Sequence, residues 1–283
     1  MQQVIHSRKE MTEPINSVVF IKQVPDVPSI RIDEQRMTII REGVESIINP
    51  LGCVALQAAL EVREVKGGLV TAITMGPPQS EEVLREALAA GADRGVLLTD
   101  PVFAGADTLA TSHVLARAVS KLQPVPDLLL CGMQTVDSDT GHVGPQLAEE
   151  LDLPQVCGVN EIHIDGHNLV LKRVSDGFID TVRVSLPALL TVSKELCPVK
   201  NISLGEIEIA FLQKDITRWT SVDLDLTRDE VGLAGSATHV RKLRSPSVKK
   251  GGKIVTGPPQ SLVNTLIRKL ESMSIIDEED GNQ

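Results

Sequence analysis

The sequence predicts an α/β fold in which a mostly parallel sheet is flanked by helices. Three features of the 283-residue chain indicate this class. Short apolar runs alternate with amphipathic, helix-like segments four times in the first half of the chain. Segments of alternating apolar and polar residues with Asp-Gly turns then predict an antiparallel hairpin region. A long stretch without periodicity precedes one last amphipathic segment, which indicates an extended C-terminal arm.

The predicted parallel sheet consists of short runs rich in leucine or β-branched residues, which are typical of strands buried on both faces. These strands are predicted at residues 17–21, 69–75, 94–99 and 127–132. Helices are predicted after Asn49-Pro50, from Ser80, over residues 107–122 and from about Val143. Ser80 is expected to cap its helix, because two glutamates follow it. Residues 30–33 and 37–40 are expected to pair as a small hairpin.

The second half of the chain predicts three hairpin strands and a strand that returns to the main sheet. They lie at residues 160–164, 168–175, 178–186 and 186–192, and a short helix at 202–212 follows. The final helix has its apolar residues on one face, which suits docking; they are Leu262, Val263, Leu266, Ile267 and Leu270. The predicted organisation is an N-terminal extension (1–16), an α/β domain (17–212), an arm that lies on another molecule (213–258), a docking helix (259–276) and an acidic tail (277–283).

Composition excludes several classes of protein. The net charge of −10, with four phenylalanines, one tryptophan and no tyrosine, opposes nucleic acid as a partner. No apolar run approaches the roughly 20 residues of a membrane span. The four cysteines form no C-x-x-C pair, and no His/Cys cluster has metal-ligand spacing, so we expect a reducing, cytoplasmic setting and no metal site. Cys131 is expected to be a buried thiol. No catalytic motif appears, so any chemistry must come from a cofactor.

The segment Leu128–Leu147 carries the functional signal. A buried strand breaks at Gly132, passes through a polar turn and enters a helix. Backbone N–H groups at such a turn, with the positive end of the helix dipole, suit a phosphate. Asp137 and Asp139 repel a phosphate, so they are interpreted as acceptors for ribose hydroxyls or as helix caps. An ordinary strand-to-helix turn remains the alternative.

Five short motifs follow one another in the order of a known family: Phe20-Ile-Lys-Gln-Val-Pro-Asp26, Asn49-Pro50, Gly76-Pro77, Gly91-Ala-Asp-Arg94 and Gly132-x-Gln134-x-x-Asp137-x-Asp139-Thr-Gly141. In this order and spacing the chain resembles the β subunit of electron-transfer flavoprotein, a family that includes the FixA proteins of nitrogen fixation. The resemblance runs from about Ser17 to Ile276.

The resemblance implies a Rossmann-like fold of adenine-nucleotide-binding type and a heterodimer with an α subunit that holds most of an FAD. It implies electron transfer between dehydrogenases of the acyl-CoA dehydrogenase type and an acceptor. Ordinary members bury an AMP in the β subunit. Bifurcating members place a second FAD there, with NADH, and would then be NADH-oxidising enzymes. The small residues near Gly141 favour the second FAD. A stand-alone nucleotide-binding or hydrolysing protein is the alternative, which the long arm opposes.

Carried over to this chain, the resemblance implies cofactor-binding residues in four segments and no catalytic residue. They are Phe20; Asn49, Pro50, Leu51 and Gly52; Met75; and Gly132, Gln134, Asp137, Asp139, Thr140, Gly141, His142 and Val143. The phosphate would lie against the backbone of residues 140–143. Val27 and Leu51 match positions that approach the partner's flavin, and Leu196 lies in a loop that matches a partner-docking loop. Asn49 can both cap its helix and contact the nucleotide. Lys22 stays open between a surface charge and a ligand contact.

Overall fold

The computed structural model describes residues 5–7, 13–26, 31–33, 38–40, 46–242, 252 and 254–276. The chain divides into two compact units, residues 1–243 and 244–283. Two sequence predictions, a flavin approach at Val27 and an acidic tail at residues 277–283, lie outside the described residues.

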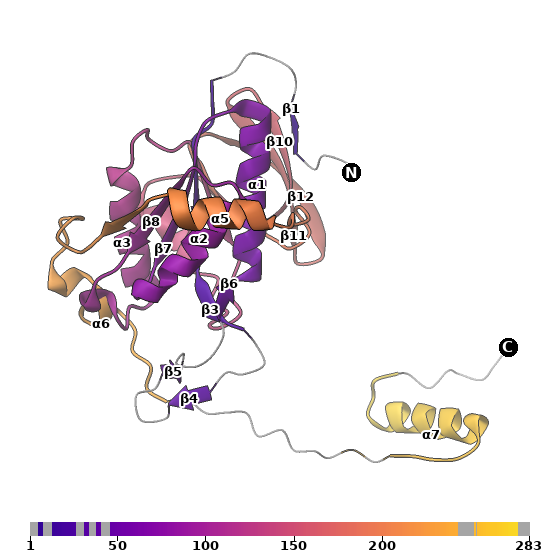
Figure 1. Cartoon of the computed structure of the whole chain (residues 1–283). Helices are drawn as coiled ribbons and strands as arrows, with labels where there is room; N and C mark the ends of the chain where they lie inside the picture. The colour runs from indigo at the N-terminus through magenta and orange to yellow at the C-terminus, as the bar shows by residue number, and fades with distance from the viewer. Residues whose placement is uncertain are drawn as a thin grey trace. The chain divides into compact units, whose positions relative to one another are not determined.

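Among the described residues, the first unit is built on a ten-stranded, mostly parallel sheet (Figure 1). The parallel strands, in spatial order, are β10 (Gln155–Asp165), β13 (Ala188–Val192), β9 (Leu128–Gly132), β2 (Ser17–Phe20), β7 (Val70–Met75), β8 (Arg94–Leu98) and β14 (Ile216–Trp219). The hairpin strands β11 (Asn168–Ser175) and β12 (Phe178–Ser185) extend the sheet antiparallel beyond β10, and β1 (Ile5–Ser7) also pairs with β10. The predicted fold class is confirmed, and so is the return of residues 188–192 to the main sheet.

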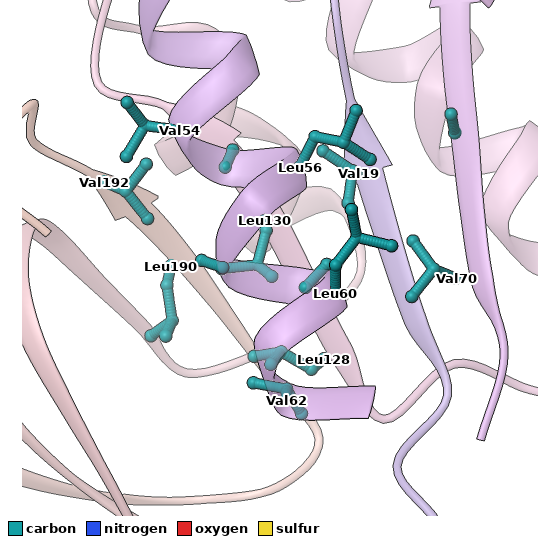
Figure 2. Close-up of a cluster of buried hydrophobic side chains, with 14 of the residues drawn as sticks. Val19, Val54, Leu56, Leu60, Val62, Val70, Leu128, Leu130, Leu190 and Val192 are labelled. Atoms are coloured by element: carbon teal, nitrogen blue, oxygen red, sulfur yellow. The ribbon is translucent and has the colours of Figure 1, made fainter. Parts of the chain in front are cut away.

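Helices cover both faces of this sheet, because successive strand residues point to opposite sides. α1 (Pro50–Lys66) and α2 (Glu81–Ala90) pack with Leu128 and Leu130, whereas α3 (Thr108–Lys121) and α4 (Val143–Glu150) pack with Leu129. Figure 2 shows apolar side chains of α1 lying over those of the central strands. The result is a three-layer domain with one apolar core on each side of the sheet.

Two small antiparallel pairs lie off the main sheet. β4 (Arg31–Asp33) pairs with β5 (Thr38–Ile40), which confirms the predicted hairpin. β3 (Gln23–Pro25) pairs with β6 (Ser46–Ile48), a pairing that the sequence did not predict. The chain does leave the main sheet before Pro25, as predicted. Strands of three residues carry too short a pattern to be recognised before their partner is known.

Ser80 lies at the start of α2 but does not cap it. Its hydroxyl donates to the side-chain oxygen of Gln23 at 3.0 Å, and no side-chain cap is formed at this end of the helix. The predicted helix is present, but the predicted cap is wrong. Ser80 ends a 3₁₀ turn (Pro78–Ser80) and has helical φ and ψ angles of −67° and −2°, whereas an N-cap residue has a non-helical backbone.

The segment after α5 (Leu204–Gln213) does not leave the α/β body at residue 213 as the sequence predicted. β14 pairs in parallel with β8 at the edge of the sheet. A 3₁₀ turn, η3 (Arg228–Glu230), and the short helix α6 (Gly232–Gly235) follow, still within the first unit. The described residues 214–242 therefore belong to the first unit. β14 has only four residues in a polar part of the sequence, so hydrophobic periodicity did not reveal it.

Two aspartates fasten this segment to the loops that follow β8. Asp100 accepts hydrogen bonds from the backbone and hydroxyl of Ser221 at 3.1 and 2.8 Å. Asp107 caps α3 by accepting from the Ala110 N–H at 2.9 Å, and it also accepts from the backbone and hydroxyl of Thr238 at 2.8 and 2.9 Å. Burial raises the pKa of Asp107, but these hydrogen bonds outweigh burial and hold the pKa below its ordinary value.

The second unit contains α7 (Pro259–Ser272), which confirms the predicted terminal helix. Its apolar residues lie on one face, and none of the side chains of the helix is buried. Val263, Leu266 and Ile267 are between 41% and 59% exposed. No helix in the described part of the chain is long and apolar enough to cross a membrane.

The start of α1 lies directly against the end of β9. A Cβ atom at Gly132 would lie 2.6 Å from the Cβ atom and 2.9 Å from the carbonyl carbon of Leu51. Both contacts are shorter than van der Waals distance, so this crossing of helix and strand requires glycine at position 132.

Replacing Asp107 by alanine removes the α3 cap and the tie to Thr238. We expect a loss of about 1–3 kcal/mol in the free energy of unfolding at pH 7, measured by urea denaturation. The folded-state pKa of Asp107 lies below the ordinary value of 3.8, so its contribution is present above that pH and is lost as the pH falls through the folded-state pKa. The difference from wild type should therefore narrow in acid. The exposed Asp215→Ala is the control, and equal losses in both variants would contradict the prediction.

Gly132→Ala should destabilise the chain by about 1–3 kcal/mol, because the added methyl group pushes the first turn of α1 away from β9. Gly205→Ala in α5 is the matched control, since no atom lies within 4 Å of the position that its added methyl group would take. We expect that control to be neutral or slightly stabilising in the same urea titration. A neutral Gly132→Ala would show that the crossing tolerates a side chain.

Candidate functional site

The carboxyl ends of three central strands meet at one edge of the sheet. In the register of the parallel pairs, Phe20 at the end of β2 lies beside Ile73 of β7 and Cys131 of β9. Met75 and Gly132 end β7 and β9 at the same edge. Ligands of open parallel sheets bind outside this edge. Three of the predicted segments are therefore brought together by strand pairing alone.

Asn49 joins the fourth segment to this edge. It lies at the N-cap position of α1, with Pro50 as the first helical residue, but its side chain makes no cap hydrogen bond. Instead its Nδ2 donates to the carbonyl of Gln134 at 2.9 Å, and its Oδ1 accepts from the N–H of Val136 at 3.1 Å. The side chain is almost fully buried. Both polar atoms of Asn49 thus hold the turn that follows β9, a role that the sequence did not indicate.

The turn from Met133 to His142 is open to solvent. The side chains of Gln134, Asp139, Thr140 and His142 are exposed. Asp139 and Gly141 have positive φ angles of 52° and 66°, and the Asp139 N–H donates to the Thr135 carbonyl at 2.8 Å. Such left-handed residues curve a turn so that successive N–H groups point to one side, which favours anions.

Helix α4 begins directly after this turn, as predicted. His142 is at its N-cap position and makes no side-chain cap. The positive end of the helix is therefore not covered by a capping side chain of His142. Val143, the first helical residue, is half-buried against the core on the α3 and α4 face.

Lys22 and Asp137 form an ion pair across the edge, with 2.8 Å between the ammonium nitrogen and the carboxylate oxygens. The Lys22 side chain is 39% exposed, whereas that of Asp137 is 2% exposed. Sequence reasoning left Lys22 open and interpreted Asp137 as a ribose acceptor or a cap. The missed signal was positional: each residue follows the end of one of two neighbouring parallel strands.

The floor beneath the turn is apolar and closely packed. Phe20 is buried in the core on the α3 and α4 face, and Met75 packs against the same core. A Cβ atom at Gly144 would lie 2.6 Å from the Thr191 Cγ2 and 2.9 Å from the Cys131 sulfur, so α4 lies very near the sheet. Burial, with a smaller contribution from Cys157, raises the pKa of the Cys131 thiol to about 12. The predicted buried thiol is confirmed, and it stays protonated at neutral pH.

The first turn of α1 provides the other wall of the edge. Pro50 is exposed, Leu51 is half-buried and Gly52 is buried. Cys53 follows, and its pKa is raised by burial and by the nearby Glu86 carboxylate. This thiol is therefore not an activated nucleophile.

Leu196 is not at this site, and its side chain does not reach the surface. It is fully buried in the core next to α1. The loop around it is held to α1 by two contacts: Cys197 Sγ with the Val54 carbonyl at 3.7 Å, and the Lys200 N–H with Gln57 Oε1 at 3.2 Å. A docking role for the Leu196 side chain does not fit this arrangement, because the loop folds its apolar residue inward.

Neither a second hollow nor a metal site adds to the candidate functional site among the described residues. A hollow lined by Val102, Arg228, Leu233 and His239 contains none of the predicted residues. No group of three or more metal-ligating side chains that could hold an ion occurs among the residues that the structure describes. At the strand-end edge, the helix start and the curved turn suit an anion. The exposed carboxylate suits hydroxyl groups, and the apolar side chains suit a flat ring. This combination suits an adenine nucleotide.

Comparison with known proteins finds a matching family and similar relatives. The electron transfer flavoprotein domain family matches residues 36–215. The electron transfer flavoprotein subunit beta of Thermoanaerobacterium thermosaccharolyticum is 45% identical over 262 residues, covering 93% of this chain and 100% of the relative. The caffeyl-CoA reductase-Etf complex subunit CarD of Acetobacterium woodii is 42% identical over 92% of this chain and 99% of its own length.

Similarity extends to FixA proteins. Protein FixA of Azorhizobium caulinodans is 40% identical over 239 residues, which cover 82% of this chain and 85% of the relative. Matches of this identity and coverage, in a chain that has the fold and the strand-end motifs expected of the family, establish its membership: the chain belongs to the family of electron transfer flavoprotein β subunits and FixA proteins.

Proposed function

We propose that this chain is the β subunit of a heterodimeric electron carrier. With an FAD-bearing α subunit, it passes electrons from a dehydrogenase of the acyl-CoA dehydrogenase type to an acceptor. The single observation that carries the proposal is the strand-end edge, where Asn49 holds the turn after β9 beside the uncapped start of α4. Family membership supports the same role.

The edge fits an adenine nucleotide in each of its parts. The N–H groups of Thr140 to Val143 would receive a phosphate, because the curved turn and the helix start place positive charge there. The exposed carboxylate of Asp139 would accept from a ribose hydroxyl. Phe20 and Met75 would provide the apolar floor for a ring. Leu51, half-buried at the start of α1, would face the flavin of the α subunit. When bound, FAD supplies the electron-transfer chemistry.

We propose a second FAD at this edge, with AMP as the alternative occupant. Thr140 and His142 have exposed side chains on either side of Gly141, so the turn is open beyond the position of a first phosphate. A second FAD would make the protein an NADH-oxidising, bifurcating enzyme, whereas AMP would make the edge a structural nucleotide site.

The second unit would bind the α subunit. α7 exposes an apolar face, and such a face is stabilised by covering it with another apolar surface. A stand-alone nucleotide-hydrolysing protein is the competing function; it would leave the exposed face of α7 without a role, and ATP turnover by the isolated chain would support it.

Counting nucleotides in the co-expressed heterodimer tests the proposal. We expect two per heterodimer, either two FAD or one FAD and one AMP, measured by chromatography of the acid extract. Asn49→Ala should release the nucleotide of the β subunit and leave the FAD of the α subunit, because the turn after β9 loses its two hydrogen bonds with the Asn49 side chain. Asn201→Ala, at an exposed position, is the control. A heterodimer without flavin would contradict the function.

Leu266→Glu should weaken the heterodimer at least about tenfold, because it places a charge in an apolar contact. The matched control is Asn264→Glu, which adds the same charge to the same helix away from the apolar face. Dissociation constants from analytical ultracentrifugation or interferometry decide the question. Equal affinities for the two variants would exclude the α7 face from the interface.

A further inference from the structure

We propose that Lys22 and Asp137 are positioning residues that hold the turn after β9 in its binding shape and neutralise its charge. The inference deepens the proposed function and rests on a nucleotide being bound at the strand-end edge. Neither residue needs to touch the nucleotide for this role. The two act through the turn that they connect to the end of β2.

The ion pair joins this turn to its neighbours together with Asn49. Asn49 holds the backbone at Gln134 and Val136, and Lys22 holds the side chain at Asp137. The two ties are themselves joined, because the Asn49 N–H donates to the Lys22 carbonyl at 2.9 Å. Lys22 therefore links the end of β2, the start of α1 and the turn that leads into α4.

The charge balance of the turn gives Lys22 a second effect. Asp137 and Asp139 place two carboxylates just before the N–H groups that would receive a phosphate. Like charges repel, so an anionic ligand is bound more tightly when one of these carboxylates is neutralised. Lys22 does this at 2.8 Å from the carboxylate that is 2% exposed.

The burial of the two partners is unequal, and this predicts unequal effects of substitution. Asp137 is almost fully shielded from water, whereas Lys22 is partly hydrated. Removing the ammonium group takes a positive charge away from a shielded carboxylate, which is costly. Removing the carboxylate leaves a lysine that water can solvate. Lys22→Gln should therefore harm nucleotide retention more than Asp137→Asn does.

The test uses the co-expressed heterodimer and the nucleotide that it carries. Lys22→Gln should raise the dissociation rate of the β-subunit nucleotide by about tenfold to a hundredfold. The rate is measured from nucleotide release during gel filtration and after rapid dilution. Lys22→Arg should retain the nucleotide nearly as wild type does. The double variant Lys22→Gln/Asp137→Asn should lose the nucleotide more slowly than Lys22→Gln, because it also removes the Asp137 carboxylate that has lost its ion pair with Lys22. Lys172→Gln, which breaks the exposed pair with Glu161, is the control and should have no effect.

A second measurement tests the turn itself. Hydrogen exchange of the Val136 and Asp139 amides, which donate to Asn49 and Thr135, should be faster in Lys22→Gln and restored in Lys22→Arg. If wild type carries the nucleotide and Lys22→Gln retains it equally, or if the double variant is worse than Lys22→Gln, the positioning role is wrong while the proposed function stands. A wild-type heterodimer without nucleotide at the β-subunit edge would overturn both.

Discussion

The site depends on the parallel pairing of β9, β2 and β7. Their common direction places Phe20, Met75 and Gly132, far apart in sequence, at one edge of the sheet. Burial of alternate strand residues under helices on both faces makes this pairing stable, since a slip by one residue would exchange the two cores. The edge is therefore rigid before any loop contributes to it.

Polar side chains that are buried or partly buried then give the loops their shape. Asn49 and Lys22 hold the turn after β9, while Asp100 and Asp107 hold the segment that follows β14. Each interaction joins segments that are far apart in the sequence. A buried polar group is costly unless it is hydrogen-bonded, so such residues fix one arrangement of the loops. The side chains of Asp139, Thr140 and His142 in the turn after β9 stay exposed, and so do Val263, Leu266 and Ile267 on the apolar face of α7.

The sequence determined the fold class, most of the strands and helices, the buried thiol of Cys131 and the strand-to-helix turn at Gly132. Hydrophobic periodicity and turn residues carry this information locally, and five ordered motifs revealed the resemblance to the family. Hydrophobic periodicity gave no signal for the shortest elements. β3, β6 and β14 span three or four residues each, so their pairing was not predicted.

The tertiary structure alone decided which polar side chain meets which. Asn49 and Ser80 lie at helix starts, where a pattern predicts caps, yet their partners are Gln134, Val136 and Gln23 from distant parts of the chain. Leu196 lies in a loop, where a pattern predicts exposure, yet α1 and the neighbouring core bury it. Local sequence determines what a segment can form by itself, whereas contacts between strand ends depend on distances that exist only after the sheet has assembled.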